Sequence, residues 1–375
     1  MRRAPLGFSR APERLTTLHL VCVVTMAGSP LAGSRSAVHN MIAASGGKII
    51  RSAARSAEEE HWEVTVAGQT RGDAATGWVL LGAPLDCSGT GRGEARAPRA
   101  LRDQGLAQRT GARDAGDVDA TVDDPNRDAR TGVIGFEQIR RSSSEIHSTV
   151  AAVLAEGEKP LVAGGDCTVL VGALAAAKER LGRVGLVFVD GHLDYFGGET
   201  SPSGEAADMD LAFVTGHGPE GLVDLAGPPP IAQPGDIVVM GHRADPEEGD
   251  PRETDLVDER IQLVEAPAIK RGDPERLGRY VAERLEAQAG HFWVHFDVDV
   301  FDQAEMPAVT YPLPDGLGWE HAEALLRPLV GSRRLVGLSV ADFVPDKDAE
   351  GRYARRLVDL VASLFTPRSA PGVGA

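Results

Sequence analysis

Cysteines and long apolar runs are scarce in this sequence. The chain has 375 residues and three cysteines, Cys22, Cys87 and Cys167. Such a low, odd number gives no disulfide framework and fits a reducing cytoplasm best. No apolar run approaches the roughly 20 residues that a membrane-spanning helix needs. The sequence therefore argues against a disulfide-stapled domain and predicts a protein without a membrane span.

Positive charge is also in short supply. The chain carries 39 Lys and Arg against 55 Asp and Glu, a formal net charge of −16. Binding to nucleic acid or to an anionic membrane depends on clustered Lys and Arg, so we expect neither partner. With 42% hydrophobic and 25% charged residues, the composition is that of a globular protein with a large core. Part of the acidity is explained if carboxylates bind a cation that neutralises them.

Residues 1–74 differ in composition from the rest of the chain. They are rich in Ala, Arg, Ser and Gly and show little periodicity, apart from a candidate strand at 61–68. Arginines precede the apolar stretch 18–28, which superficially resembles a signal peptide. His19 interrupts that stretch, and no convincing cleavage region follows it. We therefore expect a poorly ordered N-terminal extension, a cytoplasmic location and one domain over 75–375.

From Gly77 onward, apolar strands alternate with amphipathic helices. The expected strands are 77–86, 160–165, 184–190, 236–241, 261–266, 291–299 and 333–342. The expected helices are 96–106, 136–157, 168–182, 206–216, 274–288, 319–330 and 349–365, with a polar loop at 112–130. Strands that are apolar throughout are typical of a parallel sheet with both faces buried. The pattern predicts an α/β domain whose mostly parallel sheet lies between helices.

Polar side chains follow three of these strands. The segments are GGDC (164–167), DGHLD (190–194) and HFDVDVFD (295–302). In α/β sheets, ligands bind beyond the carboxyl ends of the strands. The two glycines of GGDC allow a sharp turn, after which Cys167 faces a cleft. We therefore expect the three segments to form one site.

Five side chains of these segments alternate along the backbone and so point the same way. They are Asp190, His192, Asp194, Asp297 and Asp299. Carboxylates gathered in one cleft repel each other unless cations lie among them. Mixed carboxylate and imidazole ligands suit Mn²⁺, and less exclusively Zn²⁺ or Fe²⁺. Two cations about 4 Å apart that share bridging carboxylates would hold a hydroxide between them.

These motifs resemble those of the ureohydrolase family of arginase, agmatinase and formiminoglutamase. The resemblance runs from about Gly77 to the C-terminus and also includes GAPLD, SPSG (201–204) and GLSVADFVPD (337–346). It implies a three-layer α/β/α sandwich, a site for two Mn²⁺ ions and hydrolysis of a guanidine to urea and an amine. It further implies a small-molecule guanidino substrate and a homo-oligomer, either a trimer or a hexamer.

The resemblance implies metal-ligand roles position by position. Asp190 and Asp297 would bridge the two ions, and His192 and Asp299 would complete one site. The second site would use Asp194, which we also expect to take part in catalysis, and a residue that is normally histidine.

At the ligand position that is normally histidine in the family, this chain has Cys167. As a thiolate it would bind a metal, and soft sulfur suits Zn²⁺ or Fe²⁺ better than Mn²⁺. As a neutral thiol it would leave the second site weak, with one ion per chain instead of two. As a buried structural cysteine it would be inert.

The substrate-binding positions also depart from the family pattern. Asp342 stands where the family has a glutamate facing the guanidinium, and we expect it to act in substrate binding and catalysis. Ala207 replaces a histidine proposed to shuttle protons, and Phe196 replaces an asparagine that holds the α-carboxylate. Ser203 retains the assisting serine, and Asp245 is the expected carboxylate for the α-amino group.

Three further histidines have two interpretations each. His295 lies two residues before Asp297 and either supports the cluster or packs in the core. His217 and His242 would replace the missing proton donor or, more simply, lie in surface loops.

One branch of the family also carries cysteine at the ligand position. These are the Nω-hydroxy-L-arginine hydrolases of antibiotic biosynthesis, which release hydroxyurea and ornithine. A hydroxyguanidine is less basic than a guanidine, so its neutral form is more available for attack. We therefore expect a manganese-dependent amidinohydrolase acting on Nω-hydroxy-L-arginine. The alternatives are an arginase, an agmatinase or guanidino-acid hydrolase for an unmodified guanidine, and a binding protein that kept the fold without turnover.

Overall fold

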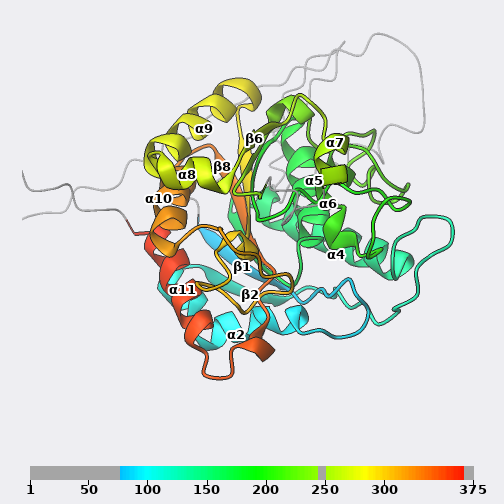
Figure 1. Ribbon diagram of the computed structural model, residues 1–375, viewed down its shortest axis with the longest axis horizontal. Helices are drawn as coiled ribbons and strands as arrows, with labels where there is room; N and C mark the ends of the chain where they lie inside the picture. The colour runs from blue at the N-terminus through cyan, green and yellow to red at the C-terminus, as the bar shows by residue number, and fades with distance from the viewer. Residues whose placement is uncertain (1–76, 244–250, 367–375) are drawn as a thin grey trace, which may run out of the picture. The chain divides into compact units, whose positions relative to one another are not determined.

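The computed structural model describes residues 77–243 and 251–366 (Figure 1). The expected N-terminal extension, its candidate strand at 61–68 and Asp245 lie outside the described residues. Within the described ranges, no helix combines the length and the apolar character needed to cross a bilayer.

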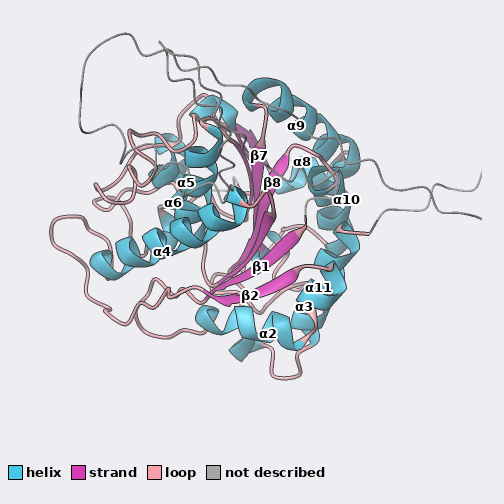
Figure 2. Cartoon of the chain, turned by 180° about the vertical axis from the view of Figure 1, so that it is seen from behind, coloured by secondary structure: helices cyan, strands magenta, loops and turns pink. Residues whose placement is uncertain are grey.

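In the described part of the chain, eight parallel strands form one sheet in the order β2-β1-β3-β8-β7-β4-β5-β6. The strands are β1 Trp78–Ala83, β2 Arg113–Asp117, β3 Lys159–Gly164, β4 Gly185–Val189, β5 Ile237–Met240, β6 Gln262–Val264, β7 Phe292–Asp297 and β8 Leu335–Ala341. Figure 2 shows this sheet between two groups of helices. The predicted three-layer α/β/α fold with a parallel sheet is confirmed.

Helices cover each face of the sheet (Figure 2). One layer contains α4 Phe136–Ala155, α5 Val169–Leu181 and α6 Asp210–Val214. The other contains α2 Ala97–Asp103, α3 Leu106–Thr110, α8 Ala266–Arg271, α9 Pro274–Ala289, α10 Trp319–Val330 and α11 Arg352–Leu364. Because side chains alternate along a strand, Phe188 belongs to the core of the first layer and Val187 to that of the second. The central strands of the sheet are mostly apolar for this reason.

Several elements differ from those expected. β2 forms inside the expected loop 112–130, and its five residues are exposed, because an edge strand is held by backbone pairing with β1 and needs no apolar side chains. The expected helix 96–106 is two helices, since Gly105 adopts a φ of 82° between them. The expected helix 206–216 is a 3₁₀ turn followed by α6. The short helices α7 (Pro251–Leu256) and α8 were not predicted, because about six residues show no clear helical repeat.

The loop after β3 carries Cys167 to the carboxyl edge of the sheet. The Gly165 amide donates to the Ala83 carbonyl at 2.8 Å, and the Asp342 amide donates to the Gly165 carbonyl at 2.7 Å. A Cβ atom at Gly165 would lie 1.7 Å from the carbonyl oxygen of Leu85. Only glycine fits here, because the backbones of two loops meet. The loop is thereby fixed between the ends of β1 and β8.

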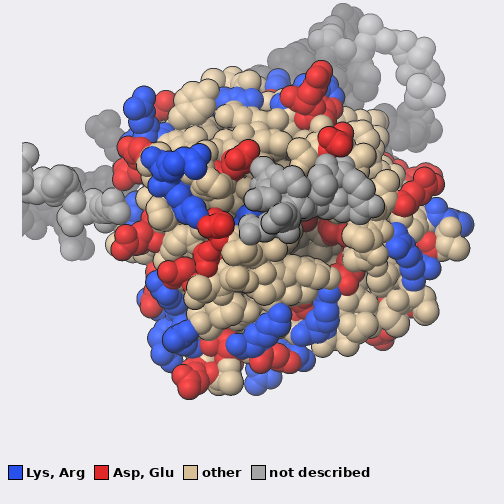
Figure 3. Space-filling view, in the orientation of Figure 1, with Lys and Arg blue, Asp and Glu red and all other residues tan. Residues whose placement is uncertain are grey.

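The excess of acidic residues is partly inside the protein. On the face shown in Figure 3, acidic and basic side chains are intermingled. Exposed pairs such as Arg109 with Asp359 each contribute about 0–1 kcal/mol. Among the described residues, twelve Asp and Glu side chains are buried, against one Arg and no Lys. Such an imbalance requires protons or cations in the interior.

Candidate metal centre

Four neighbouring strands lead into the side chains that were predicted to form a site. Cys167 follows β3, Asp190 follows β4, Asp297 ends β7 and Asp342 follows β8. These strands are adjacent in the order β3-β8-β7-β4 and are parallel, so their carboxyl ends meet at one edge of the sheet. All four side chains are buried.

Three groups of described side chains have the geometry to hold a metal ion. In each group the candidate ligand atoms lie within 4.8 Å of one another. The groups are Cys167, Asp190, His295 and Asp297; Asp190, His192 and Asp194; and Asp297, Asp299 and Asp342. The structure thus brings together all six side chains expected to be metal ligands, which we call the ligand cluster, and adds His295 and Asp342. Asp190 and Asp297, the two expected bridging residues, each belong to two groups.

Short contacts hold the ligand cluster together. The Cys167 thiol donates to Asp297 Oδ2 and lies 3.9 Å from Asp190 Oδ2. The His192 amide donates to Asp190 Oδ1, and the Asp299 amide donates to Asp297 Oδ1, each at 2.6 Å. The backbone therefore fixes one oxygen of each carboxylate that we expect to bridge, and the other oxygen faces the thiol.

Burial and crowding raise the pKa of most acidic groups in the cluster. Burial first, and then neighbouring carboxylates, hold the pKa values of Asp190, Asp194 and Asp297 well above the usual range. Burial, followed by Asp297 and Asp190, also raises the pKa of the Cys167 thiol. A divalent cation would displace protons from these groups and supply the missing positive charge. Carboxylates, imidazole and a thiol are a donor set that fits a divalent transition metal.

His192 and Asp299 form the ionised part of the cluster. Burial alone would lower the pKa of His192, but Asp299, with its Oδ2 2.7 Å from His192 Nδ1, raises it to about 9. Burial opposes ionisation of Asp299, yet His192 and Arg243 together hold its pKa below the usual range. Arg243 was not predicted; it is buried and donates to the carbonyls of Asp299 and Phe301 at 3.2 and 2.8 Å. Its only sequence signal was an arginine in the loop that follows an apolar strand.

The two expected catalytic aspartates have left-handed backbone conformations. The φ angles of Asp194 and Asp342 are 49° and 65°. This conformation costs roughly 1–2 kcal/mol for most residues that carry a Cβ atom. Neighbouring backbone groups hold both residues: the Asp194 carbonyl accepts from the Leu211 amide at 3.1 Å, and the Asp342 amide donates to Gly165. Backbone strain of this kind is concentrated at functional sites.

His295 belongs to one of the three groups and emerges on the same face of the sheet as Asp297. Its side chain is fully buried and stacks on Phe188, with ring centroids 5.3 Å apart. Nδ1 lies 2.7 Å from Ser339 Oγ, and Nε2 has no hydrogen-bond partner among the described residues. Burial lowers the pKa of His295 to about 3, so the ring is neutral.

A cavity of about 490 Å³ opens onto the ligand cluster. Among its lining residues are four of the positions expected to contact substrate or to have lost a family side chain: Phe196, Ser203, Ala207 and Asp342. Ser203 Oγ donates to Asp208 Oδ2 at 2.6 Å and accepts from the Glu205 amide at 2.9 Å. Asp342 Oδ2 accepts from the Thr310 amide at 3.2 Å. The cavity wall is therefore acidic near the ligand cluster and apolar at Phe196.

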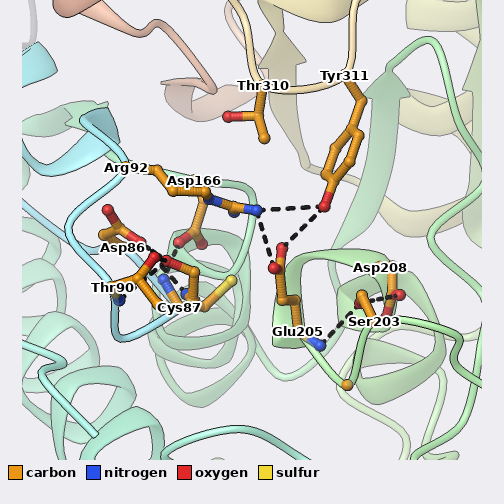
Figure 4. Close-up of polar contacts among 12 residues, drawn as sticks. Asp86, Cys87, Thr90, Arg92, Asp166, Ser203, Glu205, Asp208, Thr310 and Tyr311 are labelled. Carbon is orange, nitrogen blue, oxygen red and sulfur yellow. Dashed lines mark hydrogen bonds and ion pairs between the residues drawn. The ribbon is translucent and has the colours of Figure 1, made fainter. Parts of the chain in front are cut away.

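The cavity mouth holds a charged group that was not predicted. Arg92 Nη1 lies 2.8 Å from Glu205 Oε1 and 3.2 Å from the Tyr311 hydroxyl (Figure 4). Arg92 Nη2 also lies 3.4 Å from Glu94 Oε1, and Glu94 is buried. Arg92 comes from the glycine-rich turn SGTGRG, a stretch that carries no catalytic motif. Its place in the site depends on contacts between segments more than 100 residues apart.

Two other histidines and one aspartate complete the surroundings. His217 is exposed, as expected for a surface loop. His242 is buried instead, because the Ala266 amide at the start of α8 donates to the His242 carbonyl at 3.2 Å and holds this loop against α8. The expectation of a surface loop is wrong for this residue. Asp210, the first residue of α6, is buried, and neither carboxylate oxygen has a hydrogen-bond partner among the described residues. Burial, and then Asp190, raise the pKa of Asp210.

This fold, with buried side chains that could hold a metal ion, defines an α/β protein with a candidate metal centre, and sequence comparison identifies the family. The Arginase family model matches residues 76–366. The arginase of Bacillus caldovelox is 25% identical over 293 residues, covering 76% of this chain and 97% of that protein. The arginase of Agrobacterium fabrum is 27% identical over 300 residues, covering 77% and 90% of the two chains. The native structure of the Bacillus caldovelox arginase superimposes with a TM-score of 0.72 at 24% identity, covering 78% of this chain and 99% of the other.

The chain belongs to the arginase family. It is a ureohydrolase, an enzyme that hydrolyses C–N bonds in linear amidines. This membership favours an enzyme over the binding protein considered above.

Proposed function

We propose that this enzyme is a manganese-dependent amidinohydrolase that cleaves Nω-hydroxy-L-arginine to hydroxyurea and ornithine. The observation that carries the proposal is the Cys167 thiol lying against Asp297 and Asp190 inside the ligand cluster. Cysteine weakens or softens one metal site, and such a site favours a substrate that is easier to attack. A hydroxyguanidine meets this need because it is less basic than a guanidine.

Each part of the site has a task in the proposed reaction. The ligand cluster would hold the ions, which lower the pKa of water and so supply hydroxide near neutrality. Asp342, grouped with Asp297 and Asp299, would orient the hydroxyguanidine by hydrogen bonds. The leaving amine must collect a proton, and Ala207 cannot give one. Burial, and then Asp299, raise the pKa of Asp342, so Asp342 is our candidate for the group that holds this proton.

The cavity mouth supports an amino-acid substrate. Arg92 offers a guanidinium to an α-carboxylate, and Glu205 offers a carboxylate to an α-ammonium group; both line the cavity. Arg92 would bind the α-carboxylate in place of the family asparagine, whose position is occupied by Phe196 in this chain. Phe196 is the observation that favours a second candidate, agmatine, because agmatine has no α-carboxylate and tolerates an apolar wall.

A substrate panel on Mn²⁺-loaded protein tests the proposal. We expect ornithine to form faster from Nω-hydroxy-L-arginine than from arginine, with little turnover of agmatine. Arg92→Gln should raise the KM for Nω-hydroxy-L-arginine by about 10- to 100-fold, since a charged hydrogen bond contributes about 1.5–3 kcal/mol. Arg96→Gln is the matched control, because Arg96 pairs with Asp346 at the surface. Faster turnover of arginine would overturn the substrate assignment, and a preference for agmatine that is unchanged in Arg92→Gln would establish the second candidate.

A further inference from the structure

His295 carries a buried ring nitrogen that no described hydrogen bond satisfies. Within residues 77–243 and 251–366, Nε2 has no hydrogen-bond partner, although the side chain is fully buried. A buried polar atom left unsatisfied destabilises the folded state. Such an atom inside a group of cation-binding side chains is therefore a sign of a missing ligand interaction.

The contact at Nδ1 of His295 indicates which ring nitrogen is available to bind a metal. Ser339 Oγ lies 3.0 Å from Trp293 Nε1 and 2.7 Å from His295 Nδ1. The indole nitrogen can only donate, and a hydroxyl oxygen can accept two hydrogen bonds. When Ser339 accepts from both rings, the proton of His295 is on Nδ1 and the lone pair is on Nε2. Metal-binding histidines are oriented in this way by a hydrogen bond at the other nitrogen.

The position of His295 matches that of a ligand. It precedes Asp297 by two residues on β7, so both side chains emerge on the same face of the sheet. A ring nitrogen of His295, the Cys167 sulfur and oxygens of Asp190 and Asp297 lie within 4.8 Å of one another. Ligand bonds of about 2.0–2.3 Å bring two ligands of one ion to within about 4.6 Å. The four atoms are thus close to the spread that a single cation requires.

We propose that His295 binds the cation that Cys167, Asp190 and Asp297 share. The imidazole missing from the position of Cys167 would thus be supplied from β7. The resulting set of one thiol, one imidazole and two carboxylates suits Zn²⁺, Fe²⁺ or Co²⁺ better than a site of oxygen ligands alone. This inference rests on the metal centre of the proposed function and adds a ligand to it. Cys167 then belongs to a four-ligand metal site and does not mark the loss of one.

The test measures metal binding by the full-length protein with Zn²⁺ and Co²⁺ as probes. In His295→Gln we expect one Co²⁺ per chain to bind at least about 10-fold more weakly, with loss of the absorption that arises from the thiolate–cobalt bond. The matched control is His242→Gln, because His242 is also buried with an unpartnered ring nitrogen and belongs to none of the three groups among the described residues. The control should bind Co²⁺ as wild type does. Equal affinity and an equal spectrum in His295→Gln would overturn the proposal.

A second measurement covers the case in which His295→Gln fails to fold. His192→Asn removes the other imidazole found in the three groups, so X-ray absorption of its Zn²⁺ form reports on His295. Imidazole and sulfur around the same zinc support the proposal, and sulfur without imidazole refutes it. The two proposals fail separately. Wild-type protein that shows this zinc site but hydrolyses no guanidine contradicts the proposed function alone, and active protein with sulfur-only zinc contradicts this inference alone.

Discussion

Removing the bound metal should destabilise this protein, and the loss should grow with pH. In the folded chain the pKa values of Cys167, Asp190, Asp194 and Asp297 are raised, first by burial. A carboxyl whose folded pKa is raised favours the folded state below its unfolded pKa of about 3.9. That contribution is lost as the pH rises through the folded pKa. The folded state of the metal-free protein is therefore least stable at pH values where the carboxylates are deprotonated. A cation binds to that deprotonated form.

The size of the effect follows from mass action. A free metal concentration of about 1,000 times Kd stabilises the folded state by about 4 kcal/mol per site. The region matched by the family model spans residues 76–366. At about 2.1 cal/mol/K of unfolding entropy per residue, one such site raises the Tm by about 7 °C.

Calorimetry from pH 5 to 8, with chelator and then with excess Mn²⁺, measures this difference. We expect the Mn²⁺-dependent rise in Tm to increase with pH and to shrink strongly in Asp190→Asn. Asp236→Asn is the control, because Asp236 is also buried but pairs with Arg183 away from the ligand cluster. An equal rise in Tm at pH 5 and pH 8, or an undiminished rise in Asp190→Asn, would refute the reasoning.

Two further changes test the packing around the site. Gly165→Ala should lower the free energy of unfolding by more than about 2 kcal/mol and weaken metal binding, because its Cβ atom would meet the Leu85 carbonyl at 1.7 Å. Denaturation and metal titrations measure both effects. Gly235→Ala is the control and should change neither quantity, because a Cβ atom there would meet no described atom within 4 Å. The pKa of His242 is lowered to about 4 by burial and then by Arg243, so stability should fall by up to about 3 kcal/mol as the pH drops from about 6.5 through 4. In denaturant titrations, His242→Gln should reduce this loss of stability at acidic pH. An unchanged dependence of stability on pH would exclude His242 as its source.

The strands and the cluster were predictable because each has a local signal. Apolar runs followed by DGHLD and HFDVD place Asp190 and Asp297 at strand ends, and a parallel sheet then brings those ends together. β2 had no such signal, since an edge strand of exposed residues looks like a polar loop. Arg92 was missed for a different reason. Its partner Glu205 lies 113 positions away, and no pattern in either segment encodes their contact.

His295 shows the limit of pattern alone. Alternation along the strand placed it near Asp297, and that much the sequence could predict. The position of its ring, whose Nε2 has no partner among the described residues, depends on Ser339 in β8 and on Phe188 in β4. The direction in which Nε2 points is therefore set only when these three strands are in register.

The strand order has a consequence for how this protein is made. β8, the last strand along the chain, lies between β3 and β7 and joins the two halves of the sheet. A chain still on the ribosome therefore holds two partial sheets with unpaired edges until residues 335–341 have emerged. Such edges are prone to misassembly, so a pause in translation near the end of the message is more hazardous here than one near the middle. Cys167, which follows β3, can therefore reach Asp297 of β7 only when synthesis is almost finished.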